Sequence, residues 1–141
     1  MKNKIIASAL TLILLLCMIS GTAFAAVIDN DDAIMPMYVG VHATMVSLDI
    51  PSSGWADCYG LIQITSGHTA ELTLSLMRQS EGSATWSNVT SWTDSTYPYE
   101  IEEEYYVSSG YTYRLKLTAN VYDDDGNRVS RPIAYSDEVY H

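Results

Sequence analysis

The sequence predicts an all-β protein, an antiparallel β-sandwich of about seven strands. From Tyr38 onward, short segments in which apolar and polar side chains alternate recur at intervals of roughly 12 residues. Clusters of Gly, Ser, Pro and Asp separate these segments, as turn residues do. The apolar spacing of about 3.6 residues that indicates a helix is absent beyond residue 25. An open barrel built from the same strands is the alternative.

The first three strands are expected at 43–50, at 55–65 and within AELTLSLMR, which shows the clearest alternation in the chain. The turns PSSG and SGH separate them. The residues expected to face the core from the second and third strands are Ala56, Cys58, Gly60, Ile62, Ile64, Ala70, Leu72, Leu74 and Leu76. Cys58 is therefore expected as a small buried residue, with a reactive or intermolecularly paired thiol as the alternative.

Four further strands are expected at 85–93, 97–107, 111–122 and 129–140, of which the last has the weakest pattern. The alternation of 111–122 is nearly perfect and predicts which side chains it buries. Its inward residues are Tyr113, Leu115, Leu117, Ala119 and Val121, and its outward residues are Arg114, Lys116, Thr118 and Asn120.

Residues 1–25 have the features of a secretory signal peptide. Lys2 and Lys4 precede an apolar run, and Ala23-Phe24-Ala25 supplies small residues at the cleavage spacing. Cleavage after Ala25 would release the protein outside the cell, with no membrane attachment; an uncleaved anchor and a lipoprotein using Cys17 are alternatives. We expect residues 26–37 to form a flexible acidic leader and residues 38–141 to form a single β-sandwich domain.

Negative charge dominates the expected mature chain. Two of the seven basic residues lie in the signal peptide, so five remain against 17 acidic residues. Such a chain repels nucleic acids and anionic lipid surfaces, and it attracts cations or basic partners. Cleavage also leaves Cys58 as the one cysteine, which excludes an intramolecular disulfide.

The segment YEIEEEYYVSSGYTYRLKLTANVYDDDGN (99–127) resembles the E strand, loop and F strand of fibronectin type III and other immunoglobulin-like domains. The resemblance implies that Gly110 lies in a loop crossing between sheets and that Tyr113 forms a tyrosine corner. A simple hairpin at Ser108–Gly110 is the alternative, with Glu104 facing Arg114. We favour the crossing, because the hairpin would turn Glu103 toward the core opposite Leu115.

Residues 43–140 also resemble a group of small secreted proteins of Gram-positive bacteria. The shared features are a signal peptide, an SG turn before a strand with Ala and Cys, a tryptophan pair and the segment YRLKLTANVYD. The chain departs from fibronectin type III domains in lacking a tryptophan within its second strand, since Trp55 lies at the strand's start. The group has no assigned function, so the resemblance implies no catalytic residues.

The acidic segment VYDDDGNRVS contains Asp123–Asp125 and predicts a hairpin turn rather than a calcium loop. With Gly126 at position 6 of an EF-hand loop, Val121 and Pro132 would occupy the two end ligand positions. A weak surface cation site at the same turn stays compatible with this interpretation. No metal or cofactor site is expected.

Two other features suggest functions. Glu100, Glu102 and Glu104 alternate onto one face of a strand, which favours a solvated outer face or, alternatively, a small secreted hydrolase. The aromatic residues Trp92, Tyr97 and Tyr99 are a possible binding surface for an extracellular protein or glycan. We expect a non-enzymatic secreted binding module of unknown partner, with the hydrolase and a structural protein without a small ligand as alternatives.

Overall fold

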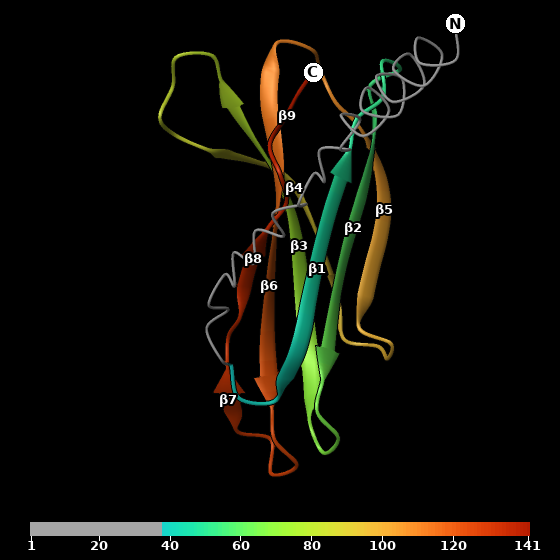
Figure 1. Ribbon diagram of the computed structural model, residues 1–141, viewed down its shortest axis with the longest axis vertical. Coiled ribbons are helices and arrows are strands. Elements are labelled where there is room, and N and C mark those ends of the chain that lie inside the picture. The colour runs from blue at the N-terminus through green and yellow to red at the C-terminus, as the bar shows by residue number, and fades with distance from the viewer. Residues whose placement is uncertain (1–37) are drawn as a thin grey trace, which may run out of the picture. The chain divides into compact units, whose positions relative to one another are not determined.

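Antiparallel strands account for most of the described part of the chain (Figure 1). The computed structural model describes residues 38–141, so the expected signal peptide and acidic leader lie outside the described residues. The strands are β1 (Val41–Asp49), β2 (Trp55–Ile64), β3 (Thr69–Ser80), β4 (Ser87–Asp94), β5 (Glu100–Tyr106), β6 (Tyr111–Tyr122), β7 (Arg128–Ser130), β8 (Ile133–Tyr135) and β9 (Val139–Tyr140).

The strands form two sheets, as the predicted immunoglobulin-like β-sandwich requires. Sheet A has the order β1-β2-β5. Sheet B has the order β4-β3-β6, and β7, β8 and β9 each pair with β6 at the other edge. Every pairing is antiparallel. The strands of the described residues thus make a sandwich and not an open barrel.

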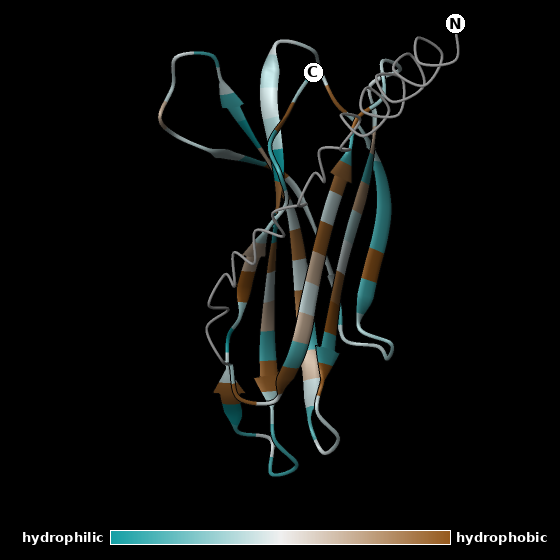
Figure 2. Ribbon diagram, viewed as in Figure 1, coloured by the Kyte–Doolittle hydropathy of each residue, from teal (hydrophilic) through white to brown (hydrophobic). Residues whose placement is uncertain are grey.

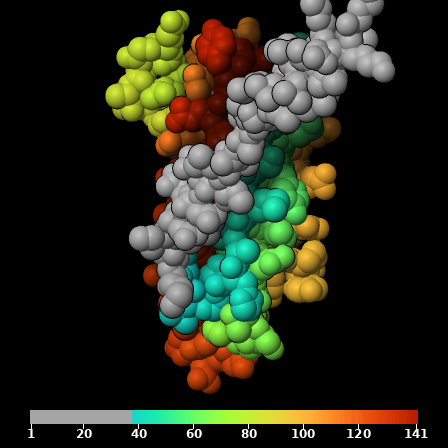
Figure 3. Space-filling view, viewed as in Figure 1, coloured from blue at the N-terminus to red at the C-terminus, as the bar shows by residue number. Residues whose placement is uncertain are grey.

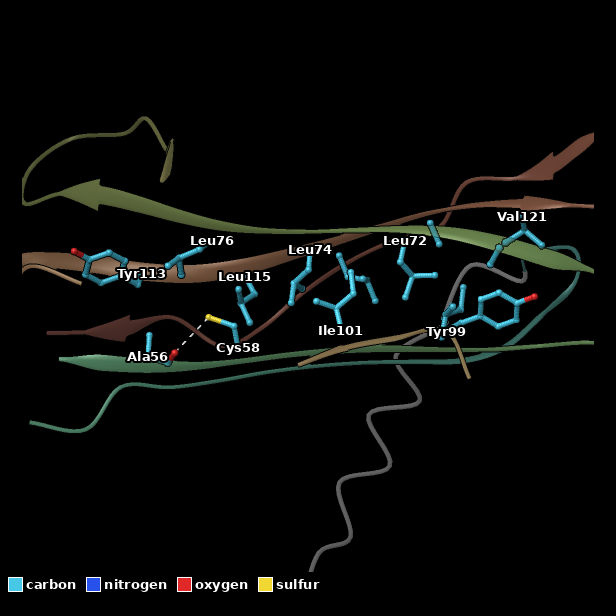
Figure 4. Close-up of a cluster of buried hydrophobic side chains, with 14 of the residues drawn as sticks. Ala56, Cys58, Leu72, Leu74, Leu76, Tyr99, Ile101, Tyr113, Leu115 and Val121 are labelled. Carbon is cyan, nitrogen blue, oxygen red and sulfur yellow. Dashed lines mark hydrogen bonds between the residues drawn. The ribbon is translucent and has the colours of Figure 1, made fainter. Parts of the chain in front are cut away.

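The core lies between the two sheets and is built by the alternation that the sequence predicts. Apolar residues recur at every second position along β3 and β6, and Figure 2 shows the resulting bands of hydropathy. Opposite residues pair across these strands, as Leu72 does with Ala119 and Leu74 with Leu117. Figure 4 shows Leu72 and Leu74 pointing from sheet B toward sheet A, where Cys58 and Ile101 lie. All inward residues expected from β3 and β6 are buried, whereas Ile64 is only partly buried.

The last expected strand, 129–140, is wrong as a single element, because the structure breaks it into β7, β8 and β9. Pro132 has no backbone N–H, which interrupts a ladder. The Ser136 hydroxyl then accepts a hydrogen bond from the Leu115 amide at 2.9 Å, in place of a backbone carbonyl. The fifth strand also starts later than expected, since Pro98 precedes it and Tyr99 has a φ of 60°.

The connection between β5 and β6 crosses from sheet A to sheet B (Figure 1). Gly110 has a φ of 86°, a conformation that glycine adopts without steric cost. The Tyr113 hydroxyl donates a hydrogen bond to the Ser108 carbonyl oxygen at 2.6 Å, which is the geometry of a tyrosine corner. The expected crossing is confirmed, and the hairpin alternative is wrong because Glu104 lies opposite Asp57 instead of Arg114.

Replacing Tyr113 with phenylalanine tests how much this corner stabilises the fold. We expect Tyr113→Phe to lower the free energy of unfolding by about 1–2 kcal/mol, because the Ser108 carbonyl loses its donor. Urea unfolding measures the change. Tyr140→Phe is the control, since Tyr140 is an exposed side chain, and it should change stability by less than about 0.5 kcal/mol. Equal losses in the two variants would contradict a stabilising role for the corner.

Candidate functional site

The outer face of sheet A is the most distinctive surface of the described residues. Cys58 and Gly60 of β2 face the core, so their neighbours in the strand face outward. The register of β1 and β5 against β2 then fixes which side chains lie beside them. We call this surface the acidic face, and it consists of Met45, Ser47, Asp49, Trp55, Asp57, Tyr59, Leu61, Glu100, Glu102, Glu104 and Tyr106. Figure 3 shows residues of β2 and β5 together along one side of the molecule, in green and orange.

Like charges lie directly opposite one another across all three strands of this face. Asp57 of β2 is paired with Asp49 of β1 on one side and with Glu104 of β5 on the other. Opposed like charges destabilise a sheet, so this row does not serve the fold. Tyr59 is the next outward residue of β2 after Asp57. Its hydroxyl donates a hydrogen bond to Glu100 Oε2 at 3.3 Å. Burial and the Glu100 carboxylate raise the pKa of Tyr59.

No basic side chain neutralises the acidic face from within its own sheet. The strands of sheet A contain six carboxylates, at Asp49, Asp57, Glu100, Glu102, Glu103 and Glu104, and no lysine or arginine. The strands of sheet B contain two carboxylates, Glu71 and Asp94, and four basic residues, Arg78, Arg114, Lys116 and Arg128. Among the strands, the carboxylates are thus concentrated in sheet A and the basic residues in sheet B.

Arg114 of sheet B makes contacts with aromatic rings and with a carboxylate near its own sheet. Its guanidinium lies 4.0 Å from the centroid of the Trp86 ring and 4.6 Å from that of Tyr135. It also forms an ion pair of 3.7 Å with Glu138. These contacts hold Arg114 on the outer side of β6, as predicted for that position, and leave the carboxylates of sheet A to face solvent.

Aromatic rings lie at the end of the acidic face where the carboxylate row runs. The Trp55 side chain is 52% exposed, and its ring contacts the Tyr106 ring edge to face at a centroid distance of 5.7 Å. Two shallow depressions meet here, and the residues they share are Trp55, Asp57 and Glu104. Carboxylates beside an exposed indole are a combination that binds ammonium and guanidinium groups, through charge and through cation–π attraction.

The structure brings together two of the three aromatic residues that the sequence suggested as a binding surface, since the Tyr97 and Tyr99 rings contact edge to face at a centroid distance of 5.8 Å. Tyr97 is 81% exposed, but its neighbour Tyr99 belongs to the buried core cluster. Trp92 is half-buried against that core, opposite Leu74, and its ring contacts Tyr105 at 6.2 Å. Trp92, Tyr97 and Tyr99 therefore do not share one exposed patch.

The carboxylates of β5 lie on an open surface of the sheet. Glu100, Glu102 and Glu104 are exposed along the open outer face. No carboxyl group of residues 38–141 is buried. Glu103 lies at an inward position opposite Cys58, yet it too is exposed, beside a depression that Trp92 and Asp94 line.

The aspartates at 123–125 form a turn, as expected. Asp123 Oδ1 accepts hydrogen bonds from the amides of Asp125 at 3.1 Å and Asn127 at 2.8 Å. The Asn127 amide is the main cause that lowers the pKa of Asp123. Gly126 has a φ of 79°, which completes the turn. Among the described residues, no group of three or more His, Cys, Asp or Glu side chains is placed to hold a metal ion.

Cys58 is buried in the folded protein. Its side chain is 1% exposed and its Sγ lies 3.8 Å from the Ala56 carbonyl oxygen. Burial, together with the Asp57 and Glu103 charges, raises the pKa of its thiol to about 12. Because the thiolate is the nucleophilic form, this environment suits a core residue, as the sequence predicted.

Residues 38–141 contain no helix that is long and apolar enough to span a bilayer. Comparison of the chain with models of protein families finds none that matches, and a search of curated proteins finds no match either.

Proposed function

We propose that the protein is a secreted, non-enzymatic binding module whose acidic face binds a positively charged segment of an extracellular partner protein. The observation that carries this proposal is the segregation of charge, with six carboxylates and no lysine or arginine in the strands of sheet A. The features of a signal peptide in residues 1–25 support secretion.

The row formed by Asp49, Asp57 and Glu104 favours a cationic partner over the alternatives. A protein with a purely structural role gains nothing from three opposed carboxylates, which oppose the pairing of its own strands. A neutral glycan could stack on Trp55 but would leave the carboxylates without a counter-charge. Lysine and arginine side chains satisfy both features, because their charge pairs with the carboxylates and their cationic groups stack on the indole ring.

Charge-neutral substitutions in the carboxylate row test the proposal. The triple variant Asp49→Asn, Asp57→Asn, Glu104→Gln should bind an oligolysine peptide about 10-fold more weakly than the unmodified protein, since each exposed charge pair contributes modestly. Titration calorimetry with the peptide measures this. Binding of the unmodified protein should also weaken between about 50 mM and about 200 mM salt.

A matched control separates the acidic face from overall charge. The triple variant Glu81→Gln, Asp124→Asn, Asp125→Asn removes the same charge from loops outside sheet A. It should retain the affinity to within about 2-fold, because screening weakens distant charges. Equal losses in the two triple variants would mean that net charge alone attracts the peptide, and the proposed site would be wrong.

A further inference from the structure

The hydrogen bonds between β2 and β5 determine which backbone groups of β5 remain free. The Ile62 amide donates to the Tyr99 carbonyl oxygen at 3.1 Å, and the Val107 amide donates to the Gly54 carbonyl oxygen at 2.8 Å. Hydrogen-bonded positions alternate along an antiparallel ladder. The odd-numbered residues of β5 therefore bond to β2, and the even-numbered residues turn their N–H and C=O groups toward the opposite edge.

These free backbone groups belong to the glutamates that form one side of the acidic face. Glu100, Glu102 and Glu104 are the even-numbered acidic residues of β5, and each is exposed. Within residues 38–141, no strand pairs with this edge of sheet A. Figure 1 shows β5 at the edge of sheet A, beside β2. This edge thus offers unpaired backbone donors and acceptors together with three outward carboxylates.

The charge of this edge determines which strand it accepts. A second copy of β5 paired edge to edge in antiparallel register would place glutamates beside glutamates, which is destabilising. Glu103, an exposed charge at an inward position, adds to this protection against self-pairing. The free edge of β1 differs, because Asp49 at its end is its one carboxylate. The β5 edge therefore disfavours pairing with a second copy of β5 and favours pairing with a positively charged strand.

We propose that the partner segment binds in an extended conformation as a fourth strand of sheet A, hydrogen-bonded to β5, with lysine or arginine at every second position. This inference rests on the proposed function and specifies its mode of binding. Every second side chain of the added strand then lies opposite Glu100, Glu102 or Glu104 on the acidic face. Cα atoms opposed in this way lie about 5.5 Å apart, within reach of a lysine–glutamate ion pair.

Peptides with the same composition but different patterns test this mode. The first probe alternates lysine and threonine over the length of β5, and the second has the same residues with the lysines in one block. Strand addition predicts that the alternating peptide binds about 10-fold more tightly, since only it places each lysine beside a glutamate. Hydrogen exchange should also slow at the Glu100, Glu102 and Glu104 amides in the complex.

Backbone methylation of the alternating peptide provides the decisive control. A residue opposite Glu102 directs its own N–H toward β5, because hydrogen-bonded pairs exchange both bonds. N-methylation of the lysine amides should therefore abolish the advantage of the alternating peptide. N-methylation of the threonine amides, which point away from β5, should leave the affinity within about 2-fold.

The outcomes distinguish the two proposals. Equal binding of all lysine peptides, methylated or not, would overturn strand addition while leaving the acidic face as the binding site. Absence of binding by every peptide would overturn both.

Substitutions of Glu102 supply a test on the protein itself. Glu102→Ala removes the charge, whereas Glu102→Pro also removes the edge N–H. Neither change removes a bond to β2, and proline is tolerated where a strand's N–H faces solvent. Strand addition predicts that the proline variant binds the alternating peptide at least about 5-fold more weakly than the alanine variant. Equal affinities of the two variants would contradict the inference.

Discussion

Leu117→Ala is expected to lower the free energy of unfolding by about 2–5 kcal/mol. The Leu117 side chain is 1% exposed and lies at the centre of sheet B, opposite Leu74. Truncation removes buried methyl groups and leaves a cavity that the two packed sheets can fill only in part. Urea unfolding, followed by tryptophan fluorescence, measures the loss.

A neighbouring position controls for the effect of alanine on the strand itself. Thr118 follows Leu117 and faces outward, so Thr118→Ala changes strand propensity without opening a cavity in the core. We expect it to lower stability by less than about 1 kcal/mol. A loss below about 0.5 kcal/mol for Leu117→Ala would show that the two sheets are not packed through this side chain.

The second large effect is expected at Gly60. Glycine is required there because the core has no room for a Cβ atom, and not because of an unusual backbone conformation. A Cβ atom at this position would lie 2.9 Å from Leu74 Cδ1 and 3.1 Å from Leu117 Cδ1. Both leucines are fully buried, so they have little room to move aside. Gly60→Ala should therefore lower the free energy of unfolding by about 1–3 kcal/mol, as overpacking of a core does.

Combining the two substitutions tests the contact between the sheets directly. In the Leu117→Ala background, the new methyl group at position 60 enters space that the leucine has vacated. The double variant should therefore be more stable than the sum of the single losses predicts, by about 0.5–3 kcal/mol. Strict additivity would mean that Gly60 and Leu117 do not meet across the core.

The strands and their buried faces could be predicted because alternation is a local property. The inward residues of 70–76 and 113–121 depend only on the pleat of one strand, and all of them are buried. The division of 129–140 into three short strands was only partly predictable in this way. Pro132 marks the first break locally, but the second depends on the Ser136 hydroxyl reaching the Leu115 amide, 21 residues away in the chain.

The candidate site was less predictable, since it is assembled by pairing between distant strands. The sequence placed Asp57 and Glu104 on outward positions of separate strands, but their opposition follows from the neighbour order β1-β2-β5. The hairpin alternative matched the charges of Glu104 and Arg114, but the chain crosses between the sheets, as we had favoured, and separates them. The burial of the aromatic residues was hard to predict for a similar reason, because Tyr99 lies in the core and Trp92 packs against it from another strand.

The unequal charge of the strands also makes the outer face of sheet A the place where a cationic partner, as proposed above, would be attracted first. The strands of sheet A carry six carboxylates without a basic residue, whereas basic residues outnumber acidic ones in sheet B. A molecule of this kind rotates in the field of a cationic partner before contact, within the Debye length of about 8 Å at physiological salt. Added salt should then slow association far more than it speeds dissociation, because the field guides the encounter and short-range contacts hold the complex.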